Sequence, residues 1–266
     1  ILMSIDPLKF YNLLADNDIE FFTGVPDSLL KQFCLCVDDN VTKGHHVISA
    51  NEGNAISLAA GHHLGTGKVP LVYMQNSGFG NAINPLLSLC DPSVYSIPML
   101  VIIGWRGEPG VRDEPQHFKQ GKVQESLLNA MDIPFFILAK NEKDIRSKIS
   151  KAIEIAVSKN QPFVFLIKKG TFSKYHTESM SNELPVMNRE KALEIILSQL
   201  PKDVIVVSTT GKTSREIFEI RKENAEPHHM DFLTVGSMGH CSSIALGIAI
   251  SNPKRKVVCI DGDGAL

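Results

Sequence analysis

The most informative stretch of the sequence is Lys256-Val257-Val258-Cys259-Ile260-Asp261-Gly262-Asp263-Gly264-Ala265-Leu266. Its apolar run, 257–260, is typical of a buried parallel strand, and the Asp and Gly residues after it are typical of a tight turn. Open α/β sheets bind ligands at the carboxyl ends of their strands. Glycine lets a backbone approach an anion closely, and Asp263 offers a hard oxygen ligand to a divalent cation. The stretch therefore indicates an α/β fold, and the turn is either a metal and phosphate site or, as is more common for an isolated Gly-Asp-Gly, an ordinary polar turn.

Length and composition indicate a protein with two domains that binds a small molecule. The 266 residues, 43% of them hydrophobic, suffice for two moderate cores. A net charge of -2 gives no electrostatic footprint for nucleic acid or for an anionic membrane. Without a long apolar run or a signal-peptide pattern at the amino end, we expect a cytoplasmic protein.

The cysteines give no pattern of a disulfide framework or a zinc site. There are five of them, and none is spaced as C-x-x-C. We therefore expect reduced and mostly buried thiols at Cys34, Cys36, Cys90, Cys241 and Cys259.

Strand and helix patterns alternate along the first part of the chain. We expect strands at 20–26, 46–50, 69–74, 99–104, 134–138 and 163–167. Helices are expected from Asp6 (the cap), from Asp27 or Ser28, over 55–64, after Asn81 and over 143–159. The long segment 104–117 is rich in charge, Gly and Pro and is expected to be a loop. This alternation predicts a doubly wound parallel sheet.

A second α/β unit follows a polar segment. We expect an α/β domain over 1–170, a linker over 171–188, and an incomplete second α/β domain over 189–266. Its expected elements are a helix 189–199 capped by Asn188, a strand 204–208, a turn 209–212, a helix 214–220, a strand 232–235, a helix 242–250 and a strand 257–260. Both sheets are expected to be parallel and doubly wound.

Three tempting motifs do not hold. Thr210-Gly211-Lys212-Thr213 resembles the end of a phosphate-binding P-loop, but that motif needs a glycine where Val206 stands. Gly78-Phe79-Gly80 lacks the third glycine of a dinucleotide fingerprint. Adjacent histidine pairs diverge on a helix or strand and are poor metal sites.

Two candidate sites remain in the first domain. Glu52 follows a strand and precedes a helix of small residues, where a buried carboxylate could exchange a proton with a heteroaromatic nitrogen. A helix-start glutamate stabilised by the helix dipole is the equal alternative. Arg106, Arg112, His117 and Lys119 could attract a small dianion, unless the loop's charges compensate one another.

The combined motifs resemble the phosphonopyruvate decarboxylases, which are thiamine-diphosphate-dependent decarboxylases. The resemblance runs in order along essentially the whole chain. It rests on Thr23-Gly24-Val25-Pro26-Asp27-Ser28, Asn51-Glu52-Gly53-Asn54-Ala55, Asn76-Ser77-Gly78-Phe79-Gly80-Asn81-Ala82-Ile83-Asn84-Pro85, the 106–117 loop, Ser208-Thr209-Thr210-Gly211-Lys212-Thr213-Ser214-Arg215-Glu216, Gly236-Ser237-Met238-Gly239-His240 and Gly262-Asp263-Gly264.

The resemblance implies a pyrimidine-binding first domain and a diphosphate-binding second domain. Glu52 would hydrogen-bond the cofactor's pyrimidine ring and promote loss of the thiazolium C2 proton. Asp263 would be a ligand of Mg²⁺. Thr210, Gly211, Gly236, Met238, Gly262, Gly264 and Ala265 would contact the cofactor, with Met238 holding it in a bent conformation. Asp27 and His117 would be catalytic and, with Arg106, would face the substrate.

The resemblance also implies the reaction and the assembly. A small 2-oxo acid, 3-phosphonopyruvate, would lose carbon dioxide to give phosphonoacetaldehyde in phosphonate biosynthesis. The enzyme would be a homo-oligomer whose active site lies at the subunit interface. In the family, the motif begun by Asp263 continues to a second metal ligand, so we expect this chain to be a truncated product. The alternatives are a sulfopyruvate decarboxylase and a non-catalytic subunit that pairs with a full-length partner.

Overall fold

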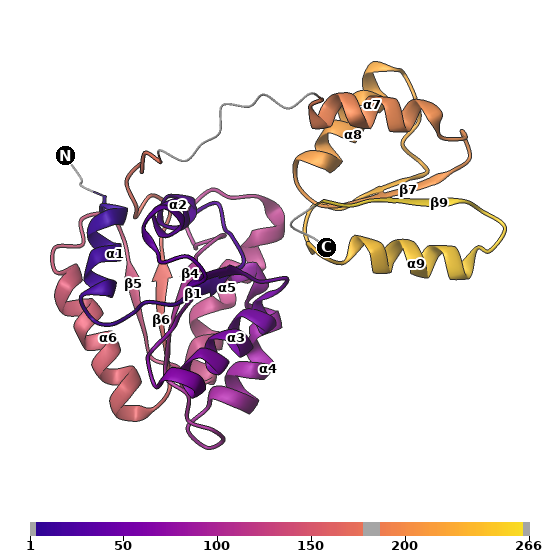
Figure 1. Cartoon of the computed structure of the whole chain (residues 1–266). Coiled ribbons are helices and arrows are strands. Elements are labelled where there is room, and N and C mark those ends of the chain that lie inside the picture. Colours follow the sequence, from indigo (N-terminus) through magenta and orange to yellow (C-terminus); the bar gives the residue numbers. More distant parts are fainter. Residues whose placement is uncertain (1–3, 178–186, 263–266) are drawn as a thin grey trace. The chain divides into compact units, whose positions relative to one another are not determined.

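The structure, a computed structural model, describes residues 4–177 and 187–262 of the chain. The chain divides into two compact units, Ile1–Met180 and Ser181–Leu266 (Figure 1). Each unit is an α/β layer structure built on its own parallel sheet.

Six parallel strands form the sheet of the first unit, in the order β2-β1-β3-β4-β6-β5. All six strands expected from the sequence are present, 99–104 with the expected ends and the others with shifted ends. They are β1 (Phe22–Gly24), β2 (His46–Ile48), β3 (Leu71–Gln75), β4 (Met99–Gly104), β5 (Phe135–Leu138) and β6 (Pro162–Ile167).

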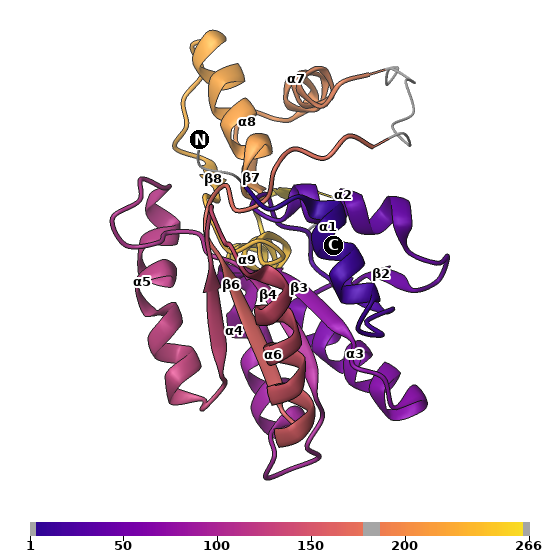
Figure 2. The same ribbon diagram turned by 90° about the vertical axis from the view of Figure 1, so that its left-hand side faces the viewer.

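Helices cover both faces of this sheet, which confirms the doubly wound prediction. They are α1 (Pro7–Ala15), α2 (Lys31–Asn40), α3 (Glu52–Thr66), α4 (Phe79–Pro85), α5 (Pro115–Ala130) and α6 (Ile145–Lys159), with a 3-10 turn (Asn76–Gly78) and a π-helical turn (Leu86–Cys90) beside α4. Figure 1 shows α1 and α6 on one side and α3, α4 and α5 on the other. Figure 2 looks from the side of α1 and α6.

Alternate residues of the strands pack into two hydrophobic cores, one on each face of the sheet. Leu71 and Tyr73 of β3 pack in the core under α1, α2 and α6. Val72 and Met74, their neighbours, pack in the core under α3 and α4. Because successive side chains of a strand point to opposite faces, one apolar run fills both cores.

Local sequence signals set several helix ends correctly, and two expectations were wrong. Asp6 caps α1 by accepting a hydrogen bond from the Leu8 N–H. Neither Asp27 nor Ser28 caps α2, because a turn intervenes and the helix begins at Lys31. The expected loop 104–117 ends early, because Pro115 opens α5 and places His117 in its first turn.

The second unit has three parallel strands, in the order β8-β7-β9. The strands are β7 (Ile205–Ser208), β8 (Asp231–Leu233) and β9 (Val257–Ile260), and the helices are α7 (Arg189–Gln199), α8 (Lys212–Glu223) and α9 (Cys241–Ser251). One small core lies under α7 and α8, and another under α9. As expected, Asn188 caps α7 by accepting from the Lys191 N–H.

The structure also tests two expectations from composition. All five cysteines are free thiols, four of them buried and Cys259 exposed. Within residues 4–177 and 187–262, no helix is both long and apolar enough to cross a membrane.

Candidate functional site

The carboxyl edge of the first sheet gathers the polar side chains of this unit. Strands β1, β2, β3 and β4 end at Gly24, Ile48, Gln75 and Gly104, and polar segments follow each of them. In a parallel sheet these ends meet at one edge, where open α/β folds bind ligands. Asp27, Glu52, Gln75, Asn76, Arg106, Asp113 and His117 lie in or just after these segments.

Glu52 is buried at the start of α3. The residue is 7% exposed, and its Oε2 accepts a hydrogen bond of 2.8 Å from Asn81 Nδ2. The carboxylate lies so close to Gly78 that a Cβ at that position would overlap Oε1. Glu52 is therefore both a helix-start acid and a buried, oriented carboxylate, which combines the two interpretations of the sequence.

Asp27 is a second buried carboxylate, 5% exposed. Gln75 Nε2 donates to its Oδ1 at 2.6 Å, and the Leu29 N–H donates to Oδ2 at 3.0 Å. Burial raises the pKa of Asp27, although these hydrogen bonds and the Arg106 charge oppose the rise. A cradle of donors around a carboxyl with a raised pKa is suited to holding and releasing a proton.

Arg106 is held by an acid rather than left free for an anion. Its guanidinium forms a two-point pair with Asp113, and its Nη1 donates to Ser28 Oγ at 3.1 Å. The Arg106 hydrogen bonds hold the pKa of Asp113 well below its usual range. Asn76 fixes the same loop, because its side chain both donates to the Arg106 carbonyl and accepts from the Arg106 N–H. A substrate anion would thus share this guanidinium with Asp113.

His117 reaches the site from the first turn of α5. Its ring is partly buried, and its Nδ1 makes no hydrogen bond within the described residues. Burial, followed by the nearby Arg106 charge, lowers the pKa of His117, so the imidazole is neutral at pH 7. Gly107 allows this placement, because a Cβ there would overlap the His117 carbonyl.

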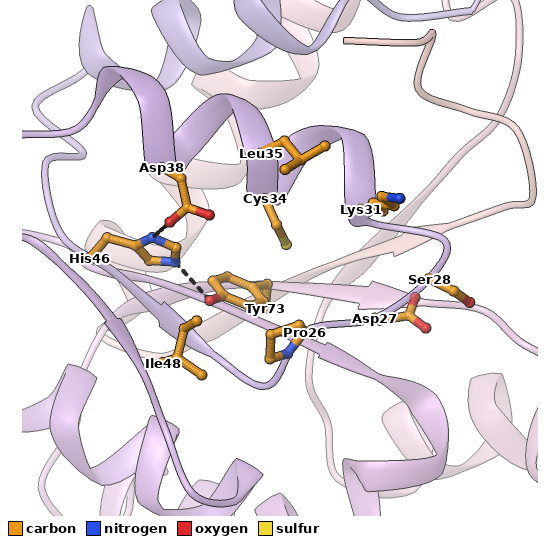
Figure 3. A pocket seen from close by; sticks show the side chains of 10 residues that line it. All are labelled: Pro26, Asp27, Ser28, Lys31, Cys34, Leu35, Asp38, His46, Ile48 and Tyr73. Atoms are coloured by element: carbon orange, nitrogen blue, oxygen red, sulfur yellow. Dashed lines mark hydrogen bonds and ion pairs between the residues drawn. The ribbon is translucent and has the colours of Figure 1, made fainter. Parts of the chain in front are cut away.

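A pocket of about 330 Å³ adjoins the Asp27 cradle (Figure 3). At one end, His46 hydrogen-bonds Asp38 at 2.6 Å and the Tyr73 hydroxyl at 2.7 Å. Figure 3 shows Asp27 and Ser28 at the other end. This volume is within the range of small-molecule sites. The other lining residues are Pro26, Lys31, Cys34, Leu35 and Ile48.

The carboxyl edge of the second sheet brings three turns together. The Thr209 N–H donates to the Ile260 carbonyl at 2.9 Å, and Thr234 Oγ1 donates to the Ser208 carbonyl at 2.8 Å. Gly211 has a φ of 89° at the start of α8, and no atom lies within 4 Å of where its Cβ would stand. An open turn at a helix start suits an anion, because the first N–H groups of the helix lack partners.

The predicted cofactor contacts of the second unit fall on these turns. Gly262 follows β9 beside Thr209. Met238 is 47% exposed in the turn that starts at Gly236. Thr210 is half-buried next to Gly211. Asp263, Gly264 and Ala265, predicted for the metal and the diphosphate, lie outside the described residues.

Sequence reasoning missed the residues that orient the predicted ones. Gln75, Asn81 and Asp113 hold Asp27, Glu52 and Arg106 respectively. Asp113 lies only seven residues from Arg106 in a loop already noted for its charges, so that pairing had a local signal. The other two pairs are 48 and 29 residues apart, and only the folded sheet brings them together.

Two known protein domains match this chain, one in each unit. Residues 9–131 match "Thiamine pyrophosphate enzyme, N-terminal TPP binding domain", and residues 209–266 match "Thiamine pyrophosphate enzyme, C-terminal TPP binding domain". The first match includes Asp27, Glu52 and Arg106, and the second includes the turns at Thr210, Met238 and Gly262.

Similar proteins include two kinds of decarboxylase. A phosphonopyruvate decarboxylase of Streptomyces hygroscopicus is 35% identical over 261 residues, which is 91% of this chain and 62% of the relative. The chain thus spans less than two thirds of that relative's length. A sulfopyruvate decarboxylase subunit alpha of Methanococcus maripaludis is 32% identical over 59% of this chain and 90% of the subunit. A subunit beta from Methanothermobacter thermautotrophicus is 42% identical over 30% of this chain and 40% of the subunit.

A solved structure supports the fold. The benzoylformate decarboxylase of Polynucleobacter necessarius superposes with a TM-score of 0.51 and 16% identity, covering 77% of this chain and 38% of that one. At that identity the likeness concerns the fold alone.

Proposed function

The chain belongs to the thiamine pyrophosphate enzyme family, and from this we propose that it decarboxylates 3-phosphonopyruvate to phosphonoacetaldehyde. The observation that carries the proposal is the Glu52 carboxylate, buried and held by Asn81 in the segment that matches the N-terminal binding domain. The 35% identity to a phosphonopyruvate decarboxylase over 91% of the chain supports this choice of substrate.

The residues of the first unit fit one end of thiamine diphosphate. Glu52 accepts from Asn81 through Oε2, and no hydrogen bond to Oε1 is found within the described part of the chain. A carboxylate with one oxygen held and one unengaged suits a heteroaromatic nitrogen. The cradle is narrow, since a single methyl group at Gly78 would displace the carboxylate.

The residues of the second unit fit the other end. The open Gly211 turn offers helix N–H groups to a diphosphate, and the Asp261–Gly262 segment adjoins it through Thr209. Asp263 follows directly and is our proposed ligand for Mg²⁺, which is a hard cation that prefers carboxylate oxygen. Met238 and Gly236 would support the cofactor from the neighbouring turn.

The chain's own groups would then manage protons and charge. When bound, thiamine diphosphate supplies the electron sink that lets a 2-oxo acid lose carbon dioxide. One proton must reach the carbon that lost the carboxylate, and we assign its storage to Asp27, whose pKa is raised by burial. His117 would accept a hydrogen bond at its unpartnered Nδ1. Arg106 would place its charge near the phosphonate while Asp113 fixes its direction.

A sulfopyruvate substrate is the second candidate. The matches to both subunits of sulfopyruvate decarboxylases favour it. The two substrates differ in their terminal anion, because a phosphonate carries more negative charge at neutral pH than a sulfonate.

We further propose a homo-oligomer, with the cofactor bound between the first unit of one subunit and the second unit of another.

Parallel assays with both 2-oxo acids test the substrate. Carbon dioxide release is measured with thiamine diphosphate and Mg²⁺, and kcat/KM is compared. We expect phosphonopyruvate to be preferred by at least about tenfold, equivalent to about 1.4 kcal/mol in transition-state binding. Preference for sulfopyruvate would move the assignment to the second candidate, and cofactor-independent release would contradict both.

A further inference from the structure

Two thiols and a carboxylate converge in the second unit. Cys241 is the first residue of α9, Cys259 lies in β9, and Asp261 follows that strand. The Sγ atoms of the two cysteines are 3.6 Å apart. The three possible ligand atoms, one from each residue, all lie within 4.8 Å of one another. Eighteen residues separate the cysteines, so the fold and not the local sequence makes this cluster.

The spacing suits one tetrahedral ion. Zinc binds thiolate sulfur at about 2.3 Å, so two sulfurs on a tetrahedral zinc stand roughly 3.8 Å apart. The observed 3.6 Å separation is close to that value. It is much longer than a disulfide bond, for which S–S is about 2.0 Å. The separation is therefore compatible with two ligands of one ion and is too long for a covalent bridge.

The carboxylate is already oriented. Asp261 Oδ1 accepts from the Gly262 N–H at 2.9 Å, which fixes the side chain. Its Oδ2 is shielded from solvent and receives no hydrogen bond from the residues that the structure describes. A shielded acceptor of this kind costs free energy unless a cation or donor reaches it.

The cluster is also accessible. Cys241 is buried, but Cys259 is exposed, so an ion can enter from solvent on the Cys259 side. The simpler interpretation is a weak S–H···S contact between two thiols. In that interpretation the Cys241 thiol also faces the Asp261 carboxylate, but a thiol is a weak donor and satisfies the shielded Oδ2 less well than a cation would.

We propose that Cys241, Cys259 and Asp261 form a binding site for a thiophilic divalent cation of the Zn²⁺ class, with water at the fourth position. Its ligand chemistry differs from that proposed for Asp263, since thiolates select soft ions and Mg²⁺ selects oxygen. It joins the start of α9 to the end of β9. The ion would thus hold together the two segments whose adjoining turns carry Met238 and Gly262.

Titration of the full chain with Co²⁺, under a non-thiol reductant, tests the site. We expect one equivalent to give a thiolate-to-metal charge-transfer band and the visible bands of tetrahedral cobalt. Zn²⁺ should displace it. Cys241→Ser and Cys259→Ser should each abolish the charge-transfer band or weaken binding at least about tenfold, because each removes a ligand. Asp261→Asn should weaken binding with less effect on the band.

Two controls separate the site from other thiols and from magnesium. Cys90→Ala removes a buried thiol of the first unit, and Asp263→Asn removes the proposed magnesium ligand. Both variants should give the same thiolate-to-Co²⁺ charge-transfer band as the unsubstituted chain. A charge-transfer band that survives both cysteine-to-serine substitutions, or that is absent with excess Co²⁺, overturns the proposal.

Alkylation keeps the test independent of the variants' folding. In the unsubstituted chain, bound Zn²⁺ should slow alkylation of the exposed Cys259, followed by mass spectrometry. An unchanged alkylation rate at saturating Zn²⁺ would contradict the site.

Discussion

Both buried carboxylates of the first unit lie against a glycine. A Cβ at Gly78 would overlap the Glu52 carboxylate, and a Cβ at Gly104 would overlap that of Asp27. Gly78 has an ordinary helical φ of -87°, so its backbone does not require glycine. The space for the carboxylate requires it.

Gly78→Ala should therefore reduce activity more than stability. The added methyl group pushes the Glu52 carboxylate from its position, and displacements of about 1 Å at a reacting group cost roughly 100-fold in rate. Gly80→Ala, two residues on, is the matched control, because nothing lies within 4 Å of its Cβ position. It should keep full activity and add about 0.5–1 kcal/mol of stability in α4. Equal activity of the two variants would show that the Glu52 position is unimportant.

Asp27 should make stability fall as pH rises. Its pKa is higher in the folded protein than in the unfolded chain, so the folded state binds more protons between the two values. Stability from this group is greatest below the unfolded pKa of about 3.9 and is lost as pH rises through the folded pKa. Denaturant unfolding at several pH values should show the unsubstituted protein losing stability relative to Asp27→Asn across this window. A difference that is constant, or that grows with pH, contradicts the burial argument.

Roles that depend on sequence neighbours, such as helix caps, were predictable. The residues that orient the site carboxylates through long-range hydrogen bonds were not. Asp6 and Asn188 cap helices as expected, because a cap depends on two or three neighbouring residues. Glu52 was expected at a buried helix start for the same reason. Asn81 and Gln75 could not be assigned, since their hydrogen bonds depend on how strands and helices pack.

At the scale of elements, the position of α5 sets the placement of His117, which was the part of the site least predictable from the sequence. Its sequence, Pro115–Ala130, has few apolar residues at helical spacing, so the sequence pattern did not predict a helix there. It docks instead through close backbone contact, with Gly121 against the Gly107 carbonyl and with Trp105 Nε1 donating to the Gly121 carbonyl at 2.9 Å. That docking sets where His117 stands.

Gly107→Ala should loosen this docking, with Gly110→Ala as the control. Both glycines have positive φ, 67° and 82°, so alanine costs about 1–2 kcal/mol at either position. Only at Gly107 would the methyl group also strike the His117 carbonyl, while the Cβ position of Gly110 is open. Gly107→Ala should thus lose a further ~1–3 kcal/mol of unfolding free energy and most of the activity. Equal losses in the two variants would contradict the docking role.

At the scale of the whole molecule, the alternation of strands and helices predicted the fold class of both units. A crossover helix between parallel strands follows from chain sterics and needs no long-range information. The strand order was not predictable, because β6 lies between β4 and β5 although it follows both in the sequence. The clustering of the Thr210, Met238 and Gly262 turns follows from the parallel order β8-β7-β9.

The most direct test of the proposed chemistry is cofactor-dependent carbon dioxide release by the unsubstituted protein and by Glu52→Gln. The substitution keeps the size of the buried side chain and removes its charge, so thermal stability serves as the control for folding. With phosphonopyruvate, thiamine diphosphate and Mg²⁺, we expect release to depend on the cofactor and to fall about 10²–10⁴-fold in Glu52→Gln. Release that needs no thiamine diphosphate, or that is unchanged in Glu52→Gln, would contradict the account.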